Sequence, residues 1–269
     1  MYDFQPLDSY DENEYVSSVA ISLNGRKLDT LIPHYRTISV TGRELIGYRI
    51  SSLDDIPGRD GSLVLEKTLP PRIITVRFLI SCPDSSEFRR AFNALNEELY
   101  RAHIGGDSEI TFDDEPDYYF IGTPGSVDEP PTNVNETIGQ FSIYCWSPYK
   151  TKLEPLEFTS SGTSLTIGNP SDGSIYPLKL DSISMTTVET DKVVVSNGKT
   201  GRKIILNREF LDGQTLKITP DGITLNGANI TDSLDFVESD WHDFTIHLGD
   251  TINTTPTMSR TVKVRERLL

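Results

Sequence analysis

The chain has 269 residues, of which 36% are hydrophobic, 9% aromatic and 24% charged, and its net charge is −15. This length and composition indicate a folded protein with room for two ordinary domains, and they exclude a disordered chain. With 40 acidic against 25 basic residues, the surface repels phosphate on average, so a nucleic-acid reader or a protein bound to anionic lipid is a poor fit.

The N-terminal stretch MYDFQPLDSYDENEY is acidic, whereas a secretory signal would be basic and then apolar. No apolar run is long enough to cross a bilayer, so the sequence predicts folding in a cytoplasm without membrane insertion. In a reducing compartment, we expect Cys82 and Cys145 to be two buried thiols rather than a disulfide.

Apolar and polar residues alternate along most of the first half, which is the period of a β-strand. The Asn24-Gly25 dipeptide accepts the backbone of a tight hairpin turn, and Pro70-Pro71 marks a break between two strands. The strands expected from this pattern are residues 19–23, 28–32, 62–66 and 73–80.

One segment has a helical period instead. Asp84, followed by Glu87 three residues later, is a capping box and predicts a helix start. The helix is expected to end before Gly105-Gly106. Its apolar residues recur at spacings of four, three and four, so one face should cover a sheet; they are Phe88, Phe92, Leu95 and Leu99.

After the helix, the stretch FDDEPDYYF at residues 112–120 places four carboxylates and four aromatic rings within nine residues. Grouped carboxylates can act as acids and bases or bind hard cations. Here Pro116 favours a turn between strands, and no histidine, base or metal ligand lies nearby in sequence. We therefore expect an acidic turn whose carboxylates stay in water. The flanking strands are expected at 109–112, 118–121 and 140–146, with a loop over 122–137.

The second half repeats the β pattern in shorter units, after a segment at 151–162 that is typical of a domain boundary. About eight short strands without a helix are the signature of a β-sandwich or jelly roll. The expected strands are 165–167, 178–183, 192–196, 203–207, 215–219, 223–225, 244–248 and 261–265.

Motifs for chemistry are weak throughout. The SNGKTGRK stretch at 196–203 resembles part of a phosphate-binding loop, but a valine stands where its first glycine belongs, which favours a hairpin turn. The four histidines are scattered, and His242 and His247 are expected on opposite faces of one strand. Asp235, Glu238 and Trp241 could form a glycosidase-like pair beside a sugar-stacking ring, yet a capped turn beside a half-buried tryptophan is the favoured interpretation.

The order of these signals resembles the distal tail proteins (Dit) of long-tailed bacteriophages. The resemblance rests on GRDGS at 58–62, RIITVRF at 72–78, the helix, ITFDDEPDYYF at 110–120 and FSIYCWSPY at 141–149. In the second half it rests on 169–173, 176–177, ITLNG at 223–227, the step at Trp241 and VKVR at 262–265. Together these segments cover about residues 16–269.

The resemblance implies a mainly β fold with one amphipathic helix, in two domains. Residues 1–150 would form an N-terminal β-sandwich with a helix and a protruding belt hairpin, and this domain would close a ring. Residues 151–269 would form a C-terminal galectin-like β-sandwich of the jelly-roll type. Ring closure would produce a homo-hexamer at the tail tip of the virion, assembled in the cytoplasm of the host bacterium.

The same resemblance implies partners rather than chemistry. The ring would join the tail tube protein to the tail-associated protein and to receptor-binding or baseplate proteins, with DNA only passing through the channel. No catalytic, cofactor-binding or metal-ligating residue is predicted, and no cofactor. The alternatives are a carbohydrate-binding tail-tip protein that contacts cell-wall glycan and, third, a glycosidase that uses Asp235 or Glu238.

Overall fold

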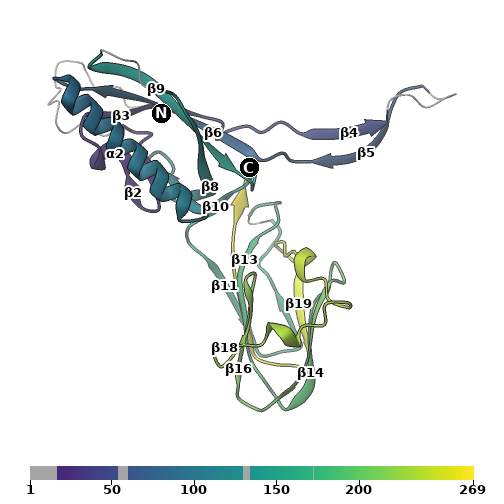
Figure 1. The fold of residues 1–269 in the computed structure, drawn as a ribbon. Helices are drawn as coiled ribbons and strands as arrows, with labels where there is room; N and C mark the ends of the chain where they lie inside the picture. The colour runs from purple at the N-terminus through teal and green to yellow at the C-terminus, as the bar shows by residue number, and fades with distance from the viewer. Residues whose placement is uncertain (1–16, 54–59, 130–133, 172) are drawn as a thin grey trace. The chain divides into compact units, whose positions relative to one another are not determined.

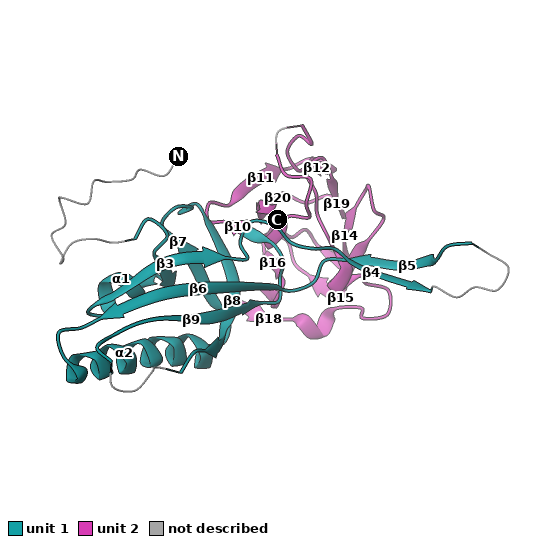
Figure 2. Ribbon diagram, turned by 90° about the horizontal axis from the view of Figure 1, so that it is seen from above, with its two compact units in different colours: residues 1–150, 269 teal, residues 151–268 magenta. Residues whose placement is uncertain are grey.

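The computed structural model describes residues 17–53, 60–129, 134–171 and 173–269 (Figure 1). The chain forms two compact units, residues 1–150 with Leu269 (unit 1) and residues 151–268 (unit 2), which Figure 2 colours separately. Across the described residues, no helix combines the length and apolar character needed to span a membrane.

Unit 1 combines a β-sheet with one long helix, α2 (Ser85–Ile104). The strands of its main sheet are β1 (Ile21–Leu23), β2 (Arg26–Lys27), β3 (Tyr35–Thr41), β6 (Arg72–Ser81), β7 (Ser108–Phe112), β8 (Tyr118–Val127) and β9 (Glu136–Cys145). They follow the order β2-β1-β7-β8-β9-β6-β3. Two further strands, β4 (Arg49–Leu53) and β5 (Leu63–Thr68), form a separate sheet.

The core of unit 1 lies between strand β6 and helix α2. Every second side chain of β6 is buried, as a strand with one covered face requires. The ring of Phe78 on this strand lies 6.2 Å from that of Phe92 on the helix, which in turn lies 5.0 Å from Phe88. Leu95 and Leu99 of the helix are also buried. The predicted helix and its apolar stripe are confirmed.

Two predictions for unit 1 are wrong. Residues 28–32 were expected as a strand, but Leu28–Leu31 is a single helical turn, α1. The Asp29 carboxylate in this turn accepts hydrogen bonds from the backbone N–H and the hydroxyl of Thr37, at 2.9 and 2.7 Å. A polar side chain that bonds to backbone competes with a strand ladder, and here it ends strand β2 at Lys27.

Half of the expected loop over 122–137 is strand. Strand β8 continues to Val127, and β9 begins at Glu136; residues 130–133 lie outside the described residues. Pro124 lacks an N–H and therefore reads as a break, but the pairing with β9 shifts register between Pro124 and Val127. The missing donor falls at that irregularity, so the sheet tolerates the proline.

Unit 2 is a β-sandwich. One sheet has the order β11-β20-β13-β16-β17-β18 and the other β12-β19-β14-β15. The strands are β11 (Leu156–Ser160), β12 (Ser164–Thr166), β13 (Lys179–Thr186), β14 (Thr190–Asn197), β15 (Lys203–Phe210), β16 (Thr215–Thr219), β17 (Gly222–Leu225), β18 (Ala228–Asn229), β19 (Thr251–Thr255) and β20 (Arg260–Arg265). Short elements are β10 (Lys150–Lys152), η2 (Thr231–Ser233), η3 (Trp241–Asp243) and β21 (Arg267–Leu268). Buried side chains from both sheets share one core, so the predicted mainly β fold class is confirmed.

The expected strand at 244–248 is wrong. Its alternating pattern comes from Phe244, Ile246 and Leu248, all buried, but the segment forms only one isolated bridge, between Ile246 and Leu178. The strand lies later, at β19, where the sequence TINTT contains a single large apolar residue, Ile252. His242 and His247 consequently do not share a strand.

The start of helix α2 gives a test with a definite pH dependence. The Asp84 carboxylate accepts hydrogen bonds from the backbone N–H groups of Ser86 and Glu87, at 2.7 and 2.9 Å. The bond from Glu87, followed by that from Ser86, holds the pKa of Asp84 below its usual value. A lowered pKa in the folded state stabilises the protein above the unfolded pKa of about 3.9, and this stabilisation is lost as pH falls through the folded pKa.

We therefore expect Asp84→Ala to lower the free energy of unfolding at pH 7. The difference from the wild type should shrink once the pH falls below about 3.9. Urea unfolding at a series of pH values measures it, with Ser85→Ala at the first helical residue as the control. A deficit that stayed constant to the lowest pH would show that the Asp84 charge does not contribute.

Candidate assembly interface

The two-stranded sheet of β4 and β5, here called the hairpin, is exposed along its whole length. All eleven residues of the two strands are exposed, and Figure 1 shows them extending beyond the main sheet of unit 1. Among the described residues, each of these strands pairs only with the other. Open strand edges invite pairing with another chain, so the hairpin is a candidate interface.

The hairpin carries apolar side chains on both faces. Ser52 pairs with Val64 and Leu53 with Leu63, and paired residues project to the same side of a sheet. Alternation along β4 therefore places Ile50 and Val64 on one face, and Leu53 and Leu63 on the other. Their side chains are 39–59% exposed. Apolar side chains grouped on an exposed hairpin make it a candidate contact surface for a partner.

The base of the hairpin is held by Arg72, the first residue of β6. Its side chain is buried, and its Nη1 donates to the carbonyls of Gly42 and Arg43, at 2.8 and 2.7 Å. Its Nε donates to the carbonyl of Pro148, at 3.0 Å. Gly42 and Arg43 precede the hairpin and Arg72 follows it, so one guanidinium ties the outgoing chain to the returning chain. Burial lowers the pKa of Arg72.

A second buried arginine connects the base to the turn between β7 and β8. Arg43 donates two hydrogen bonds to Asp114, at 2.7 and 2.6 Å, in the fork geometry that matches a carboxylate. Burial would lower the pKa of Arg43, but the bonds to Asp114 and the charges nearby outweigh it, and the net shift is upward. The guanidinium lies 4.4 Å from the centre of the Phe112 ring, and that of Arg72 lies 5.5 Å from the Phe120 ring.

The stretch 112–120 is therefore an anchor for basic side chains. The expectation that its carboxylates stay in water is incomplete, because Asp113 and Asp114 are exposed and Glu115 is half-buried, but all three also pair with basic side chains. Asp113 lies 2.7 Å from Lys27, Asp114 binds Arg43, and Glu115 pairs with Lys150. The Asp114 and Asp113 partners are 71 and 86 residues away in sequence, so no local pattern could have found them. The sequence shows that no basic residue lies close to this stretch along the chain, but it does not exclude basic residues that the fold brings near it.

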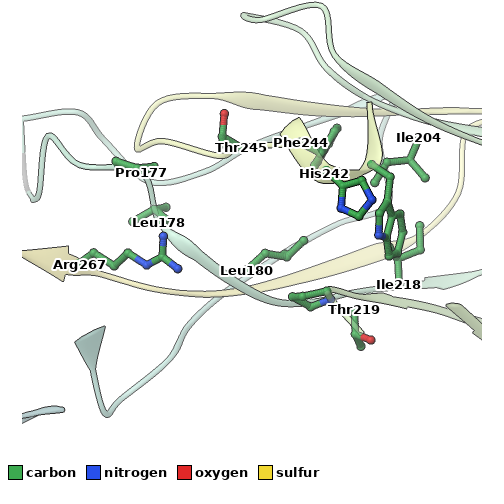
Figure 3. A pocket seen from close by; sticks show the side chains of 12 residues that line it. Pro177, Leu178, Leu180, Ile204, Ile218, Thr219, His242, Phe244, Thr245 and Arg267 are labelled. Carbon is green, nitrogen blue, oxygen red and sulfur yellow. The ribbon is translucent and has the colours of Figure 1, made fainter. Parts of the chain in front are cut away.

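Unit 2 contains a cavity of about 310 Å³ next to Trp241 (Figure 3). Its wall is mixed: Phe244 and Ile218 are among the apolar residues drawn, and four polar side chains also reach it. They are Thr219, His242, Thr245 and Arg267. None of the described residues lining this cavity is a carboxylate, the group that would accept hydrogen bonds from sugar hydroxyls. Saccharide binding therefore stays a prediction.

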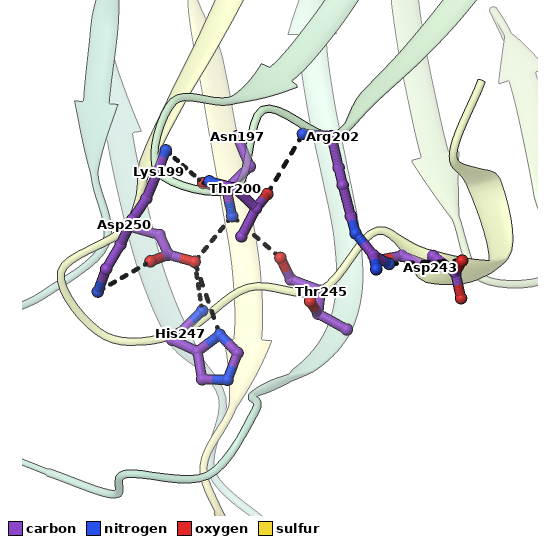
Figure 4. A network of polar contacts seen from close by, with 8 residues as sticks. All are labelled: Asn197, Lys199, Thr200, Arg202, Asp243, Thr245, His247 and Asp250. Atoms are coloured by element: carbon purple, nitrogen blue, oxygen red, sulfur yellow. Dashed lines mark hydrogen bonds and ion pairs between the residues drawn. The ribbon is translucent and has the colours of Figure 1, made fainter. Parts of the chain in front are cut away.

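The stretch SNGKTGRK forms the turn between β14 and β15, as predicted, and is held by Asn197 (Figure 4). The buried Asn197 amide donates to Asp250, at 2.7 Å, and to the carbonyl of Thr245, at 3.0 Å. Its oxygen accepts from the backbone N–H groups of Lys199 and Thr200. A phosphate loop needs such N–H groups free for its ligand, so this turn is structural.

The glycosidase alternative finds no support at Asp235. Its carboxylate accepts hydrogen bonds from the backbone N–H groups of Val237 and Glu238, both at 3.1 Å, which is the capped turn predicted above. The bond from Glu238 is the main cause that lowers the pKa of Asp235. A general acid in a glycosidase needs a raised pKa instead.

The cysteines are the two buried thiols that the sequence predicts. Cys82 and Cys145 are free and buried, and burial raises the pKa of both thiols, that of Cys145 to about 12. Within the described ranges, no group of three or more His, Cys, Asp or Glu side chains is placed to hold a metal ion. The sequence also predicts solvated turns, rather than calcium loops, at the acid-rich segments 8–14 and 54–60, which apart from Asp60 lie outside those ranges.

Comparisons with known proteins match both units. Residues 28–144 match the family model described as a phage tail protein RIFT-related domain, and residues 156–267 match a siphovirus-type tail component, C-terminal domain. A search of curated proteins returned no match.

Among solved structures, the chain is similar to the Dit protein of phage SPP1. The TM-score is 0.76 and the identity 17%, over 93% of this chain and 99% of that one, so the likeness shows the fold. That protein is described as a paradigm of the hub adsorption apparatus in phages that infect Gram-positive bacteria. Chains of two structures of the phage p2 baseplate in its activated conformation, with Sr and with Ca, match at TM-scores of 0.48 and 0.49. Their identities are 12% and 10%, over 87% of this chain and 91% of those.

Gly42 tests how tightly the base of the hairpin is packed. Its φ is +88°, and a Cβ there would lie 2.1 Å from the carbonyl oxygen of Ile73. We expect Gly42→Ala to lower the free energy of unfolding by about 3 kcal/mol, from overpacking and the left-handed backbone together. Gly61→Ala is the matched control, because φ there is +80° but the space is open. It should cost about 1 kcal/mol.

Urea unfolding of a Trp241→Phe background isolates unit 1, because Trp146 then reports alone. Equal losses at Gly42 and Gly61 would mean that the close approach to Ile73 relaxes at no cost.

Asn197 gives the equivalent test for unit 2. Asn197→Ala leaves the buried Asp250 carboxylate and the Thr245 carbonyl without that donor, and we expect a loss of about 3 kcal/mol. Lys199→Ala removes an ion pair from an exposed lysine to the same buried carboxylate, at 3.6 Å, which is longer than a hydrogen bond, and should cost less, about 1 kcal/mol. Trp241 fluorescence in a Trp146→Phe background measures both. A similar loss for the two variants would contradict the role given to Asn197.

Proposed function

Because the chain belongs to the siphophage distal tail protein (Dit) family, we propose that six copies close into a ring hub at the distal end of the tail tube. The family and fold are those of a structural tail-hub protein and not of an enzyme. The protein is a component of the phage tail and assembles into tail and baseplate complexes. We propose, in addition, the number of copies in the ring and the identity of its partners.

The observation that carries the ring is the exposed hairpin. Its apolar side chains lie on both faces, and among the described residues the buried core of unit 1 comes from other elements. A neighbouring copy could bury these side chains, since copies that each bind the next through two different surfaces can close into a ring. Burying these side chains also removes open strand edges from solvent.

The remaining assignments follow from the family. We assign ring formation to residues 1–150 and an outward-facing, galectin-like role to residues 151–269. The ring would connect the tail tube protein to the tail-associated protein and to receptor-binding or baseplate proteins. DNA would only pass through its channel, and a net charge of −15 is consistent with passage without retention. Assembly would take place in the host cytoplasm before the protein reaches the virion tail tip.

The ring predicts a particle of about 181 kDa, six times the 30.1 kDa of the chain. We expect Ile50→Ser with Val64→Ser to raise the concentration for half-assembly at least about tenfold, because two side chains on one hairpin face lose apolar burial. The fold of the single copy should be unchanged, since both side chains are exposed in it. Mass photometry and sedimentation velocity give the masses.

Val237→Ser is the control, because Val237 is 95% exposed and lies in unit 2. It should assemble like the wild type. A wild type that stays monomeric at high concentration would contradict the ring, and monomers that bound cell-wall glycan would favour the carbohydrate-binding alternative. Normal assembly of the Ile50 and Val64 variant would remove that face of the hairpin from the interface.

A further inference from the structure

We propose that Arg43, Arg72 and Asp114, here called the hairpin clamp, fix the direction in which the hairpin leaves unit 1, and that ring closure uses this direction. The inference rests on the ring proposed above and adds to it three positioning residues. None of them needs to touch the neighbouring copy.

The clamp lies at the base of the segment that carries the hairpin, and residues 44–48 and 69–71 connect it to strands β4 and β5. Arg72 Nη1 bonds to two consecutive carbonyls before the hairpin, those of Gly42 and Arg43, while its own backbone begins the strand after the hairpin. The two chain segments are therefore joined at one guanidinium. They also approach so closely that only glycine fits at position 42 against the Ile73 carbonyl.

The clamp is also attached to a part of unit 1 outside the hairpin. Arg43 forms its two bonds to Asp114 in the turn between β7 and β8. The rings of Phe112 and Phe120, one on each of these strands, lie 6.2 Å apart and next to the two guanidinium groups. The base of the hairpin is therefore attached to the main sheet, in addition to the bonds that join its two chain segments to each other.

The two buried guanidinium groups are better suited to fixing the direction of the hairpin than to stabilising the fold. Arg43 and Arg72 are 6% and 2% exposed, and Arg43 Nε and Arg72 Nη2 lack hydrogen-bond partners among the described residues. Taking a guanidinium out of water is costly, and each of the two leaves a buried donor unpaired, so stability alone does not account for them. A planar fork with fixed donors does set an angle, which apolar packing does not.

A fixed direction matters because the hairpin has no other support. Its strands are exposed throughout, so a loose base would let it sample many directions. Ordering those directions on assembly would then be a cost of binding, which a rigid base removes in advance. The clamp is therefore expected to strengthen assembly without adding a contact to it.

The test compares two neighbouring carboxylates of one turn. Asp114→Asn removes the charge facing Arg43, and Arg43→Lys keeps a charge there but loses the fork. Asp113→Asn is the matched control, because its partner Lys27 lies on β2 and the pair is about one-third exposed. Melting curves and far-ultraviolet dichroism establish that each variant is folded.

Spin labels at Glu66→Cys on the hairpin and Tyr100→Cys on helix α2 report the direction as a distance distribution. Both positions are exposed, whereas Cys82 and Cys145 react slowly near pH 7 because burial raises the pKa of their thiols. Labelled protein is diluted into excess unlabelled protein, so that only distances within one copy are recorded.

We expect a narrow distribution in the wild type and in Asp113→Asn, and a broad or displaced one in Asp114→Asn and Arg43→Lys. The last two should also need at least tenfold more protein to reach half-assembly. Distributions that are the same in all four proteins overturn the clamp, whether or not rings form. If the distances differ between the wild type and the two clamp variants but the wild type stays monomeric, the clamp is supported and only the ring is contradicted.

Discussion

The hydrogen bonds from Arg72 to the backbone at Gly42 and Arg43 are the constraint on which the arrangement of unit 1 depends. A cation that is 2% exposed has lost most of its water, and three carbonyl oxygens replace that water in fixed positions. The long excursion from β3 through the hairpin to β6 is thus held closed by polar contacts at its base. Apolar packing is not needed to hold the hairpin, so its apolar side chains remain available for another molecule.

The division between packing and polar contacts also explains what the sequence could predict. Helix α2 was predictable because its cap, its stripe at Phe88 to Leu99 and its end are all local signals. The Asn24-Gly25 turn was predictable for the same reason, and both residues have the positive φ that such a turn requires. The segment at 244–248 misled because buried apolar residues alternate there without a strand to pair with. Alternating apolar residues indicate which side chains are buried, but a strand also requires backbone hydrogen bonds to a neighbouring strand.

The base of the hairpin could not be predicted in this way. The sequence placed carboxylates and rings together at 112–120, but the basic groups that complete the arrangement come from Lys27, Arg43, Arg72 and Lys150. Their distance along the chain leaves no periodicity to detect. The fold brings them together because β1, β7 and β8 are neighbours in one sheet and because Arg43, two residues after β3, reaches the turn between β7 and β8. A resemblance in the order of signals could name the family, but it could not give these contacts.

The ion pairs and ring contacts of residues 112–120 indicate that their carboxylates have a structural role and not a catalytic one. Residues 1–150 contain 24 acidic and 13 basic residues, so basic side chains are scarce in unit 1. Four of them nevertheless converge on one nine-residue stretch, where three carboxylates are paired and three rings lie beside cations. A carboxylate that is already paired with a basic side chain is not free to bind a metal ion, and a ring beside an arginine is not open to a sugar. In FDDEPDYYF, therefore, the density of functional groups reflects the number of distant segments that the turn must hold in place.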